Sequence, residues 1–163
     1  MVRLHSPKIT PRFIALLITA LVAMSACAGN RSLPRDATDV RELATTIASF
    51  QTDAPYRYGS AGPDGFDCSG LVYFSYEKAG LRVPRATTEL KRFATRVSNR
   101  NIERGDLLFF DERGRRASHV GIYLGDGWFV HAPSSGQRVR VDRLETPYWQ
   151  DSYAFAARIA ANR

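Results

Sequence analysis

Gly65-Phe66-Asp67-Cys68-Ser69-Gly70 is the stretch in which the chain passes from a turn-rich loop into an apolar helical segment. Glycine and proline recur through residues 56–65, as is typical of a loop. The apolar spacing that follows predicts a helix that begins at Asp67 or Cys68 and continues to Ala79, and Gly80 is a stop signal. Cys68 is therefore predicted to lie at a helix N-terminus, where unpaired amides and the helix dipole favour a negative charge.

Cys68 is one of two cysteines in the chain, and the other, Cys27, lies in a segment typical of an export signal. An unpaired thiol in an oxidising compartment is a liability unless it carries out chemistry. Two histidines, His119 and His131, follow it along the chain. One cysteine and two histidines are the set that a nucleophile, its base and an orienting group require.

Plainer uses of these side chains remain open. A single histidine at a strand end is usually a polar group with a structural partner. A metal site fits poorly, because Cys68, His119 and His131 provide three ligands and their separations of 51 and 12 residues match no short zinc motif. The sequence predicts no cofactor, and it contains neither a glycine-rich phosphate loop nor a nucleic-acid-binding motif. Export argues against a cytosolic thiol redox role.

The two histidines meet only if the hairpin between them has a suitable register. His119 opens one predicted strand and His131 closes the next, and the midpoint between them is Gly125. A three-residue loop of residues 124–126 would place the two histidines opposite each other on one face of the sheet. A two-residue turn at 126–127 would shift the register and separate them. The catalytic interpretation therefore predicts the less common three-residue loop.

The order of helices and strands predicts an α+β domain. Helical spacing from Val40 to Phe50, with Asp36 or Asp39 as N-cap and Pro55 beyond its end, predicts a packing helix, and a shorter helix is expected at 87–94. From residue 106 the sequence pattern becomes typical of strands, which we place at 106–110, 119–124, 127–131, 138–141 and 153–159. Helices first and strands afterwards, joined by short links, indicate N-terminal helices packed on a central antiparallel sheet.

The first residues predict where the protein goes. Basic residues precede an apolar run at 13–23, which is too short to span a membrane and matches a secretory signal. Met24-Ser25-Ala26-Cys27 resembles a bacterial lipoprotein box, so we expect cleavage before Cys27 and its lipidation. Ordinary cleavage near Ala26 or Ala28 is the alternative. Ala28 after the anchor, rather than aspartate, favours the outer membrane facing the periplasm, by resemblance to Gram-negative sorting.

Length and composition fit one exported domain. The 163 residues divide into a signal peptide at 1–26, a lipidated cysteine and tether at 27–35, and one domain at 36–163. The chain is 44% hydrophobic, enough to fill a core. Removing the three basic residues of the signal lowers the net charge from +7 to +4. This charge suits contact with an anionic wall polymer, although a solvated basic surface is the plainer interpretation. We expect a monomer.

Several stretches together carry a family resemblance. In chain order they are Pro55-Tyr56-Arg57-Tyr58-Gly59, Phe66-Asp67-Cys68-Ser69-Gly70-Leu71-Val72, Val83-Pro84-Arg85-Ala86-Thr87, Gly105-Asp106-Leu107-Leu108-Phe109-Phe110, Ser118-His119-Val120-Gly121-Ile122-Tyr123-Leu124-Gly125 and Phe129-Val130-His131-Ala132. With this order and spacing, residues 40–159 resemble the NlpC-type cell-wall peptidases. These are papain-like cysteine peptidases that cut the peptide stems of peptidoglycan, so the resemblance implies a papain-like fold.

The resemblance also implies roles for single residues. Cys68 matches the nucleophile, His119 the base and His131 the orienting third member. Tyr56 matches a tyrosine whose hydroxyl helps to hold the oxyanion together with the Cys68 backbone amide; a simple packing ring is the alternative. Three further positions, Asp67, Ser69 and Arg85, match residues that line or brace the substrate cleft.

The expected reaction is hydrolysis of a stem bond at diaminopimelate. The bond is either D-glutamyl–diaminopimelate within a stem or the D-alanyl–diaminopimelate cross-link between stems. An amidase or acyltransferase with the same chemistry is an alternative, although some related acyltransferases place the histidine before the cysteine. A non-catalytic wall-binding lipoprotein is another.

Overall fold

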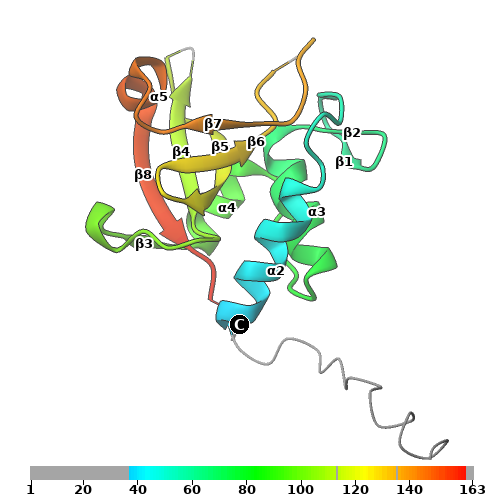
Figure 1. Ribbon diagram of the computed structural model, residues 1–163, viewed down its shortest axis with the longest axis horizontal. Helices are drawn as coiled ribbons and strands as arrows, with labels where there is room; N and C mark the ends of the chain where they lie inside the picture. Colours follow the sequence, from blue (N-terminus) through cyan, green and yellow to red (C-terminus); the bar gives the residue numbers. More distant parts are fainter. Residues whose placement is uncertain (1–36, 113, 135, 161–163) are drawn as a thin grey trace, which may run out of the picture. The chain divides into compact units, whose positions relative to one another are not determined.

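The computed structural model describes residues 37–112, 114–134 and 136–160 (Figure 1). The helices are α2 (Ala37–Ser49), α3 (Cys68–Lys78), α4 (Thr87–Phe93), the 3-10 turn η2 (Asn99–Asn101) and α5 (Pro147–Ser152). The strands are β1 (Ala61–Gly62), β2 (Gly65–Phe66), β3 (Thr95–Val97), β4 (Leu107–Glu112), β5 (Arg115–Gly125), β6 (Trp128–His131), β7 (Arg140–Arg143) and β8 (Tyr153–Arg158). The predicted signal, Cys27 and tether lie outside the described residues. No helix within the described ranges is long and apolar enough to cross a membrane.

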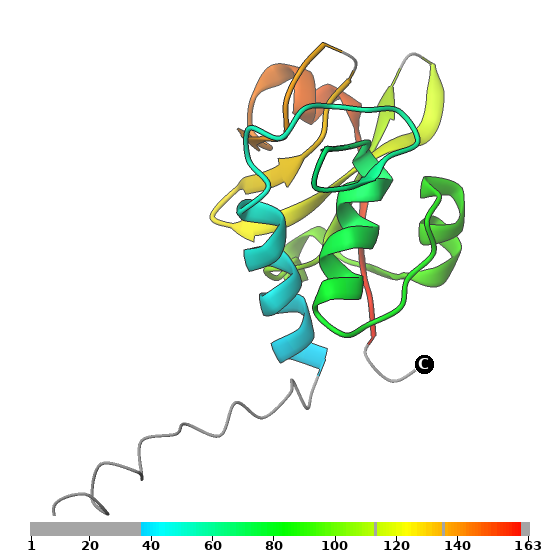
Figure 2. The same cartoon turned by 90° about the vertical axis from the view of Figure 1, so that its right-hand side faces the viewer.

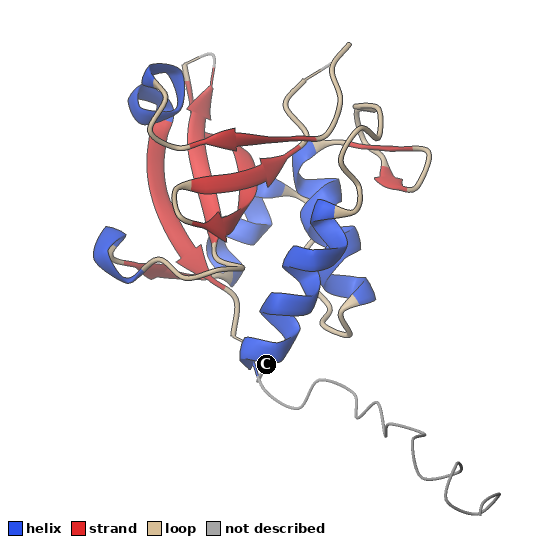
Figure 3. Ribbon diagram, in the orientation of Figure 1, coloured by secondary structure: helices blue, strands red, loops and turns tan. Residues whose placement is uncertain are grey.

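A six-stranded antiparallel sheet forms the centre of the domain. Its strand order is β3-β8-β4-β5-β6-β7, and β1 and β2 form a separate hairpin. Helices α2, α3 and α4 all contact β5, and α2 packs beside α3 (Figure 2). Figure 3 shows these helices gathered on one side of the sheet. This arrangement confirms the predicted α+β class with helices on an antiparallel sheet.

Strand β4 is buried on both faces. Its four apolar residues, Leu107 to Phe110, are all fully buried. Leu107 and Phe109 belong to the core between sheet and helices, whereas Leu108 and Phe110 pack with Trp149 on the opposite face. Trp149 comes from α5, so this six-residue helix covers the second face of the sheet. The sequence did not predict α5, because six residues are too few to show a helical period.

Most predicted elements are present, but several boundaries differ; β5, predicted from residue 119, begins at Arg115, and β4, predicted to end at residue 110, continues to Glu112. Helix α2 begins at Ala37, so Asp39 lies inside the first turn and is not the N-cap; Asp36 lies outside the described residues. Strand β7 begins two residues later than predicted. The reason is that Val139 hydrogen-bonds the loop before Pro55 instead: its amide donates to the Ala54 carbonyl at 2.8 Å, and its carbonyl accepts from Asp53 at 2.9 Å.

The hairpin between β5 and β6 differs from the prediction. Its turn consists of two residues, Asp126 and Gly127, which both have positive φ (51° and 78°), as a type I′ turn requires. Next to this turn Gly125 pairs with Trp128, whereas beyond it Tyr123 pairs with Phe129. One extra residue therefore sits in β5 as a bulge.

The bulge decides which face the histidines share. Without it, the register at the turn would pair His131 with Ile122 and put the two histidines on opposite faces. With it, Ile122 pairs with Val130, so Gly121 is the residue opposite His131. His119 lies two residues from Gly121 and thus shares its face. The predicted three-residue loop and direct pairing are wrong, but the histidines still meet, diagonally across the ladder.

Gly121 gives a test of this packing. A Cβ at this position would lie 2.7 Å from a ring carbon of Phe129 and 3.2 Å from the His131 Cβ. We expect Gly121→Ala to lower the free energy of unfolding by about 1–3 kcal/mol, measured by urea denaturation, because the tightly packed neighbours must shift. Gly62→Ala is the matched control, since a Cβ there meets nothing within 4 Å. Equal stability of the two variants would contradict the packing described here.

Candidate active site

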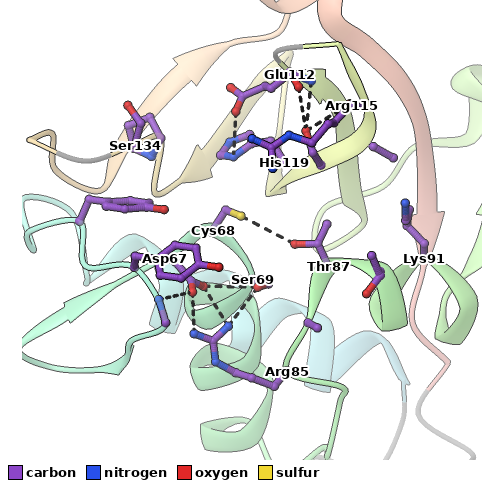
Figure 4. Close-up of a pocket in the computed structure, with 18 of the residues that line it drawn as sticks. Asp67, Cys68, Ser69, Arg85, Thr87, Lys91, Glu112, Arg115, His119 and Ser134 are labelled. Atoms are coloured by element: carbon purple, nitrogen blue, oxygen red, sulfur yellow. Dashed lines mark hydrogen bonds and ion pairs between the residues drawn. The ribbon is translucent and has the colours of Figure 1, made fainter.

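A single cavity of about 700 Å³ collects six of the seven residues that the sequence assigned to the domain's site (Figure 4). They are Tyr56, Asp67, Cys68, Ser69, Arg85 and His119. The seventh, His131, is fully buried and does not line the cavity; it contacts His119. Figure 4 shows the Cys68 sulfur between His119 on one side and Asp67 with Arg85 on the other. Within the described residues, no group of three or more His, Cys, Asp or Glu is placed to hold a metal ion.

Asp67 holds Cys68 at the start of α3. Its side chain is the N-cap and accepts a hydrogen bond from the Gly70 amide at 2.6 Å, which satisfies one unpaired donor of the first turn. The same carboxylate accepts from the Gly59 amide at 2.8 Å. Cys68 is the first residue of the helix, so its own amide belongs to the set that has no partner within the helix.

Arg85 braces the same carboxylate. Its guanidinium donates to both oxygens of Asp67 (2.9 and 2.8 Å), to the Ser69 hydroxyl at 3.0 Å and to the Ser60 carbonyl at 2.9 Å. A bidentate pair of this kind fixes both partners in orientation as well as in distance. Asp67 and Arg85 thus bond to each other and to the loop and helix groups around Cys68, which supports the bracing role among those that the sequence left open.

Burial raises the pKa of the Cys68 thiol above its ordinary value. Hydrogen bonds from the Thr87 side chain and from the backbone of Val120 and Ser69 act in the opposite direction, while the negative charge of Asp67 raises the pKa further. The Thr87 hydroxyl lies 3.8 Å from the sulfur. The sequence led us to expect an ionised sulfur at the helix N-terminus. The structure favours the neutral thiol instead, because loss of hydration outweighs the local donors.

The two histidines form a chain of hydrogen bonds with an aspartate that the sequence did not indicate. His119 Nε2 lies 2.9 Å from His131 Nδ1, and His131 Nε2 lies 3.1 Å from Asp142 Oδ2. Trp149 donates its indole N–H to the same Asp142 oxygen at 3.0 Å. Its ring stacks on His119 and meets His131 edge to face, with centroid separations of 5.7 and 4.8 Å. Because His119 uses Nε2 in this hydrogen bond, Nδ1 is the nitrogen that remains available to Cys68.

Both imidazoles are held in the neutral form. Burial lowers the pKa of His119 well below its usual value, and the neighbouring His131 and Arg140 lower it further. Burial also lowers the pKa of His131, against the opposing influence of its hydrogen bond to Asp142. A neutral His119 is the form that can accept a proton.

Tyr56 is fixed at the edge of the cavity by its backbone. Its amide donates to the Gln137 carbonyl at 2.8 Å, and it bridges to Phe66. Burial, and after it the neighbouring charge of Cys68, raises the pKa of Tyr56. The hydroxyl therefore stays protonated and can serve as a donor, although its ring also packs against the core.

Part of the cavity rim is basic. Lys91 from α4 and Arg115 and Arg116 from β5 line it. Glu112 is the carboxylate on this side, and one of its oxygens lies 4.0 Å from His119 Nδ1. Its other oxygen accepts from the Tyr148 hydroxyl of α5 at 3.2 Å. The sequence singled out none of these rim residues, because charged side chains at strand ends are usually only solvated.

Comparison with known families identifies the domain. Residues 53–158 match the pattern of the NlpC/P60 family. The chain belongs to the NlpC/P60 family. This confirms the resemblance drawn from the sequence. The papain-like fold is confirmed as well, since solved NlpC/P60 proteins superpose on the domain. One is a family member from Bacillus cereus, with a TM-score of 0.71 and 28% identity over 79% of this chain and 42% of that one. Another is the NlpC/P60 domain of the peptidoglycan hydrolase SagA, with a TM-score of 0.63 and 30% identity over 73% and 98%.

Relatives of this NlpC/P60 chain include proteins of Escherichia coli named as endopeptidases. The probable endopeptidase YafL is 43% identical over 126 residues, 74% of this chain and 51% of YafL. The murein DD-endopeptidase MepH is 41% identical over 67% of this chain and 42% of its own length. The chain thus spans about half the length of these two relatives. It matches 89% of a third, MepS, named a murein DD-endopeptidase and LD-carboxypeptidase, at 30% identity.

The buried neutral histidines predict a loss of stability in mild acid. In the unfolded chain a histidine titrates near pH 6.5, whereas in the folded protein the pKa values of His119 and His131 are lower. Below about pH 6.5 the unfolded state therefore binds more protons, and the free energy of unfolding falls with falling pH until the folded pKa values are reached. Urea midpoints measured between pH 7.5 and 5 should decrease accordingly. The His131→Asn variant should show a shallower decrease; an equal slope would show that these rings are not the source.

Proposed function

We propose that the chain is a cysteine endopeptidase that hydrolyses a peptide-stem bond of peptidoglycan at diaminopimelate. The observation that carries the proposal is the placement of the Cys68 thiol, at the start of a helix, and of His119 in one open cavity, with the buried His131 hydrogen-bonded to His119 behind it. Membership of the NlpC/P60 family and the names of the relatives support the same class of substrate.

The geometry supports acyl transfer to water. As Cys68 Sγ attacks the carbonyl carbon, its proton passes to His119 Nδ1. The Cys68 amide and the Tyr56 hydroxyl hold the oxyanion, each such donor contributing about 3 kcal/mol. The intermediate collapses, the C–N bond breaks and the amine takes the proton from His119. Water then attacks the thioester, giving a proton to His119, and the acid departs as the thiol is restored.

The charge of the cleft supports a substrate that carries free carboxylates. The side chains of Arg115, Arg116 and Lys91 line one rim, while Asp67 on the floor is already neutralised by Arg85. Peptide stems carry carboxylates on D-glutamate and diaminopimelate. Both candidate bonds, D-glutamyl–diaminopimelate and D-alanyl–diaminopimelate, stay within the proposal, because relatives with either DD- or DL-endopeptidase in their names match this chain.

Replacement of the thiol tests the proposal. The wild-type protein should release shorter muropeptides from peptidoglycan, and mass spectrometry of the products identifies the bond. Cys68→Ala should lower this activity by at least about a thousand-fold, because the reaction loses its nucleophile. Cys27→Ser is the matched control, since it replaces the chain's other cysteine and should keep full activity on soluble muropeptides. Equal product from Cys68→Ala and wild type would refute the assignment. Products cut between sugar and peptide would instead identify the amidase alternative.

We also propose that Cys27 carries a lipid that anchors the protein to the outer membrane, facing the periplasm. The support is the small-residue stretch before Cys27 and the alanine after it. Radiolabelled palmitate should be incorporated into the wild-type protein and not into Cys27→Ser. Equal labelling of the two would contradict the anchor, and a soluble periplasmic enzyme would then be the better description.

A further inference from the structure

Three hydrogen bonds converge on one oxygen of Asp142. His131 Nε2 lies 3.1 Å from Oδ2, Arg140 Nε lies 2.9 Å away and Trp149 Nε1 lies 3.0 Å away. The hydrogen bond from His131, with those from Arg140 and Trp149, holds the pKa of this carboxyl well below its usual range. Three donors at one oxygen require an acceptor, so Asp142 is a carboxylate at neutral pH and only accepts hydrogen bonds.

The sheet places Asp142 on the same face as the two histidines. In the ladder between β6 and β7, Asp142 pairs with Phe129 and Arg140 pairs with His131. Directly paired residues share a face, so Asp142 and His131 meet diagonally, as His131 and His119 do across the neighbouring ladder. Trp149 covers this face and is 4% exposed, so the chain of hydrogen bonds runs beneath a buried indole. The three side chains form one row across three strands.

The direction of each hydrogen bond in this row follows from the carboxylate. Because Asp142 only accepts, His131 Nε2 must carry the proton. In the neutral ring, Nδ1 of His131 is then an acceptor. The hydrogen bond at 2.9 Å requires a donor, so His119 Nε2 must carry its own proton. Nδ1 of His119 is thereby left with a free lone pair, as a base for Cys68 requires.

We propose that Asp142 is a positioning residue that sets the tautomer of His131 and, through it, that of His119. The catalytic consequence rests on the function proposed above. The carboxylate does not act on the sulfur directly. His131 orients His119, and Asp142 decides which nitrogen of His131 carries the proton. Arg140 and Trp149 hold the carboxylate from two sides, so that its acceptor oxygen stays directed at His131.

Ring tautomers give a direct test. Nitrogen-15 NMR of the full-length protein reports which ring nitrogen carries the proton, and the chain has only three histidines to assign. In the wild type, His119 and His131 should both be Nε2–H tautomers. In Asp142→Asn, the side-chain amide can donate to His131 Nε2. That would reverse the donor and the acceptor in both hydrogen bonds of the row and leave a proton on His119 Nδ1.

The kinetic result should match the spectrum. We expect Asp142→Asn to lower kcat by between about 10-fold and 10⁴-fold with KM nearly unchanged, because an aspartate-to-asparagine change that imposes the wrong tautomer lowers kcat by about 10⁴ in another triad. Asp151→Asn is the matched control; it removes an exposed carboxylate from α5 and should leave tautomers and kcat as in the wild type. Wild-type tautomers and kcat in Asp142→Asn would overturn the proposal.

The wild-type spectrum provides a second reading that needs no variant. A proton on Nδ1 of wild-type His131 would overturn the proposal even if Asp142→Asn failed to fold. This reading also separates the two proposals. Activity that survives Cys68→Ala would end the peptidase assignment without changing the tautomers, whereas a wrong tautomer would end only the role of Asp142.

Discussion

The carboxylate of Asp67 is the constraint on which the half of the site around Cys68 depends. It caps α3 through Gly70, accepts from the Gly59 amide of the preceding loop, and forms a two-oxygen ion pair with Arg85 from the segment before α4. Three stretches of chain are thereby tied to one group beside Cys68. The packing is close enough that a Cβ on Gly70 would lie 2.0 Å from the Ser60 carbonyl oxygen. The sulfur is thus placed by backbone and helix geometry more than by contacts of its own.

The other half of the site depends on sheet register. The bulge beside Gly125 shifts β5 by one residue against β6 and so brings His119 and His131 onto one face. The ladder to β7 adds Asp142 to that face, and α5 covers it with Trp149. The Trp149 ring strengthens these hydrogen bonds, because the two histidines beneath it are buried and few water molecules compete there. The backbone of Val120, the residue after His119, hydrogen-bonds the Cys68 sulfur.

Local signals in the sequence predicted the first half better than the second. The turn-rich loop followed by apolar helical spacing predicts a helix that begins at Asp67 or Cys68, and so the position of Cys68, although not the capping role of Asp67. The helices and most strands follow from apolar spacing. The histidine pair was predicted for a partly wrong reason. The midpoint between His119 and His131 locates the turn of a symmetric hairpin, but it cannot reveal a bulge in one strand. Asp142 was not predicted as a site residue, because the predicted strand covered residues 138–141 whereas β7 covers Arg140–Arg143. Trp149 was not predicted, because α5 is too short to show a helical period.

The expectation of an ionised sulfur also failed, and the cause is informative. Loss of hydration raises the pKa of the Cys68 thiol and lowers that of His119, so one physical effect favours the neutral form of both. In the mechanism that we propose, the charged pair of Cys68 and His119 therefore forms during attack rather than before it. In the proposed mechanism, the imidazolium of His119 then gains a neighbouring acceptor row that ends in Asp142, and the developing oxyanion gains the Cys68 amide and the Tyr56 hydroxyl. Groups that are already oriented stabilise the new charges without first reorganising. Burial that disfavours ionisation in the resting protein therefore also keeps these stabilising groups close and free of water when charge develops.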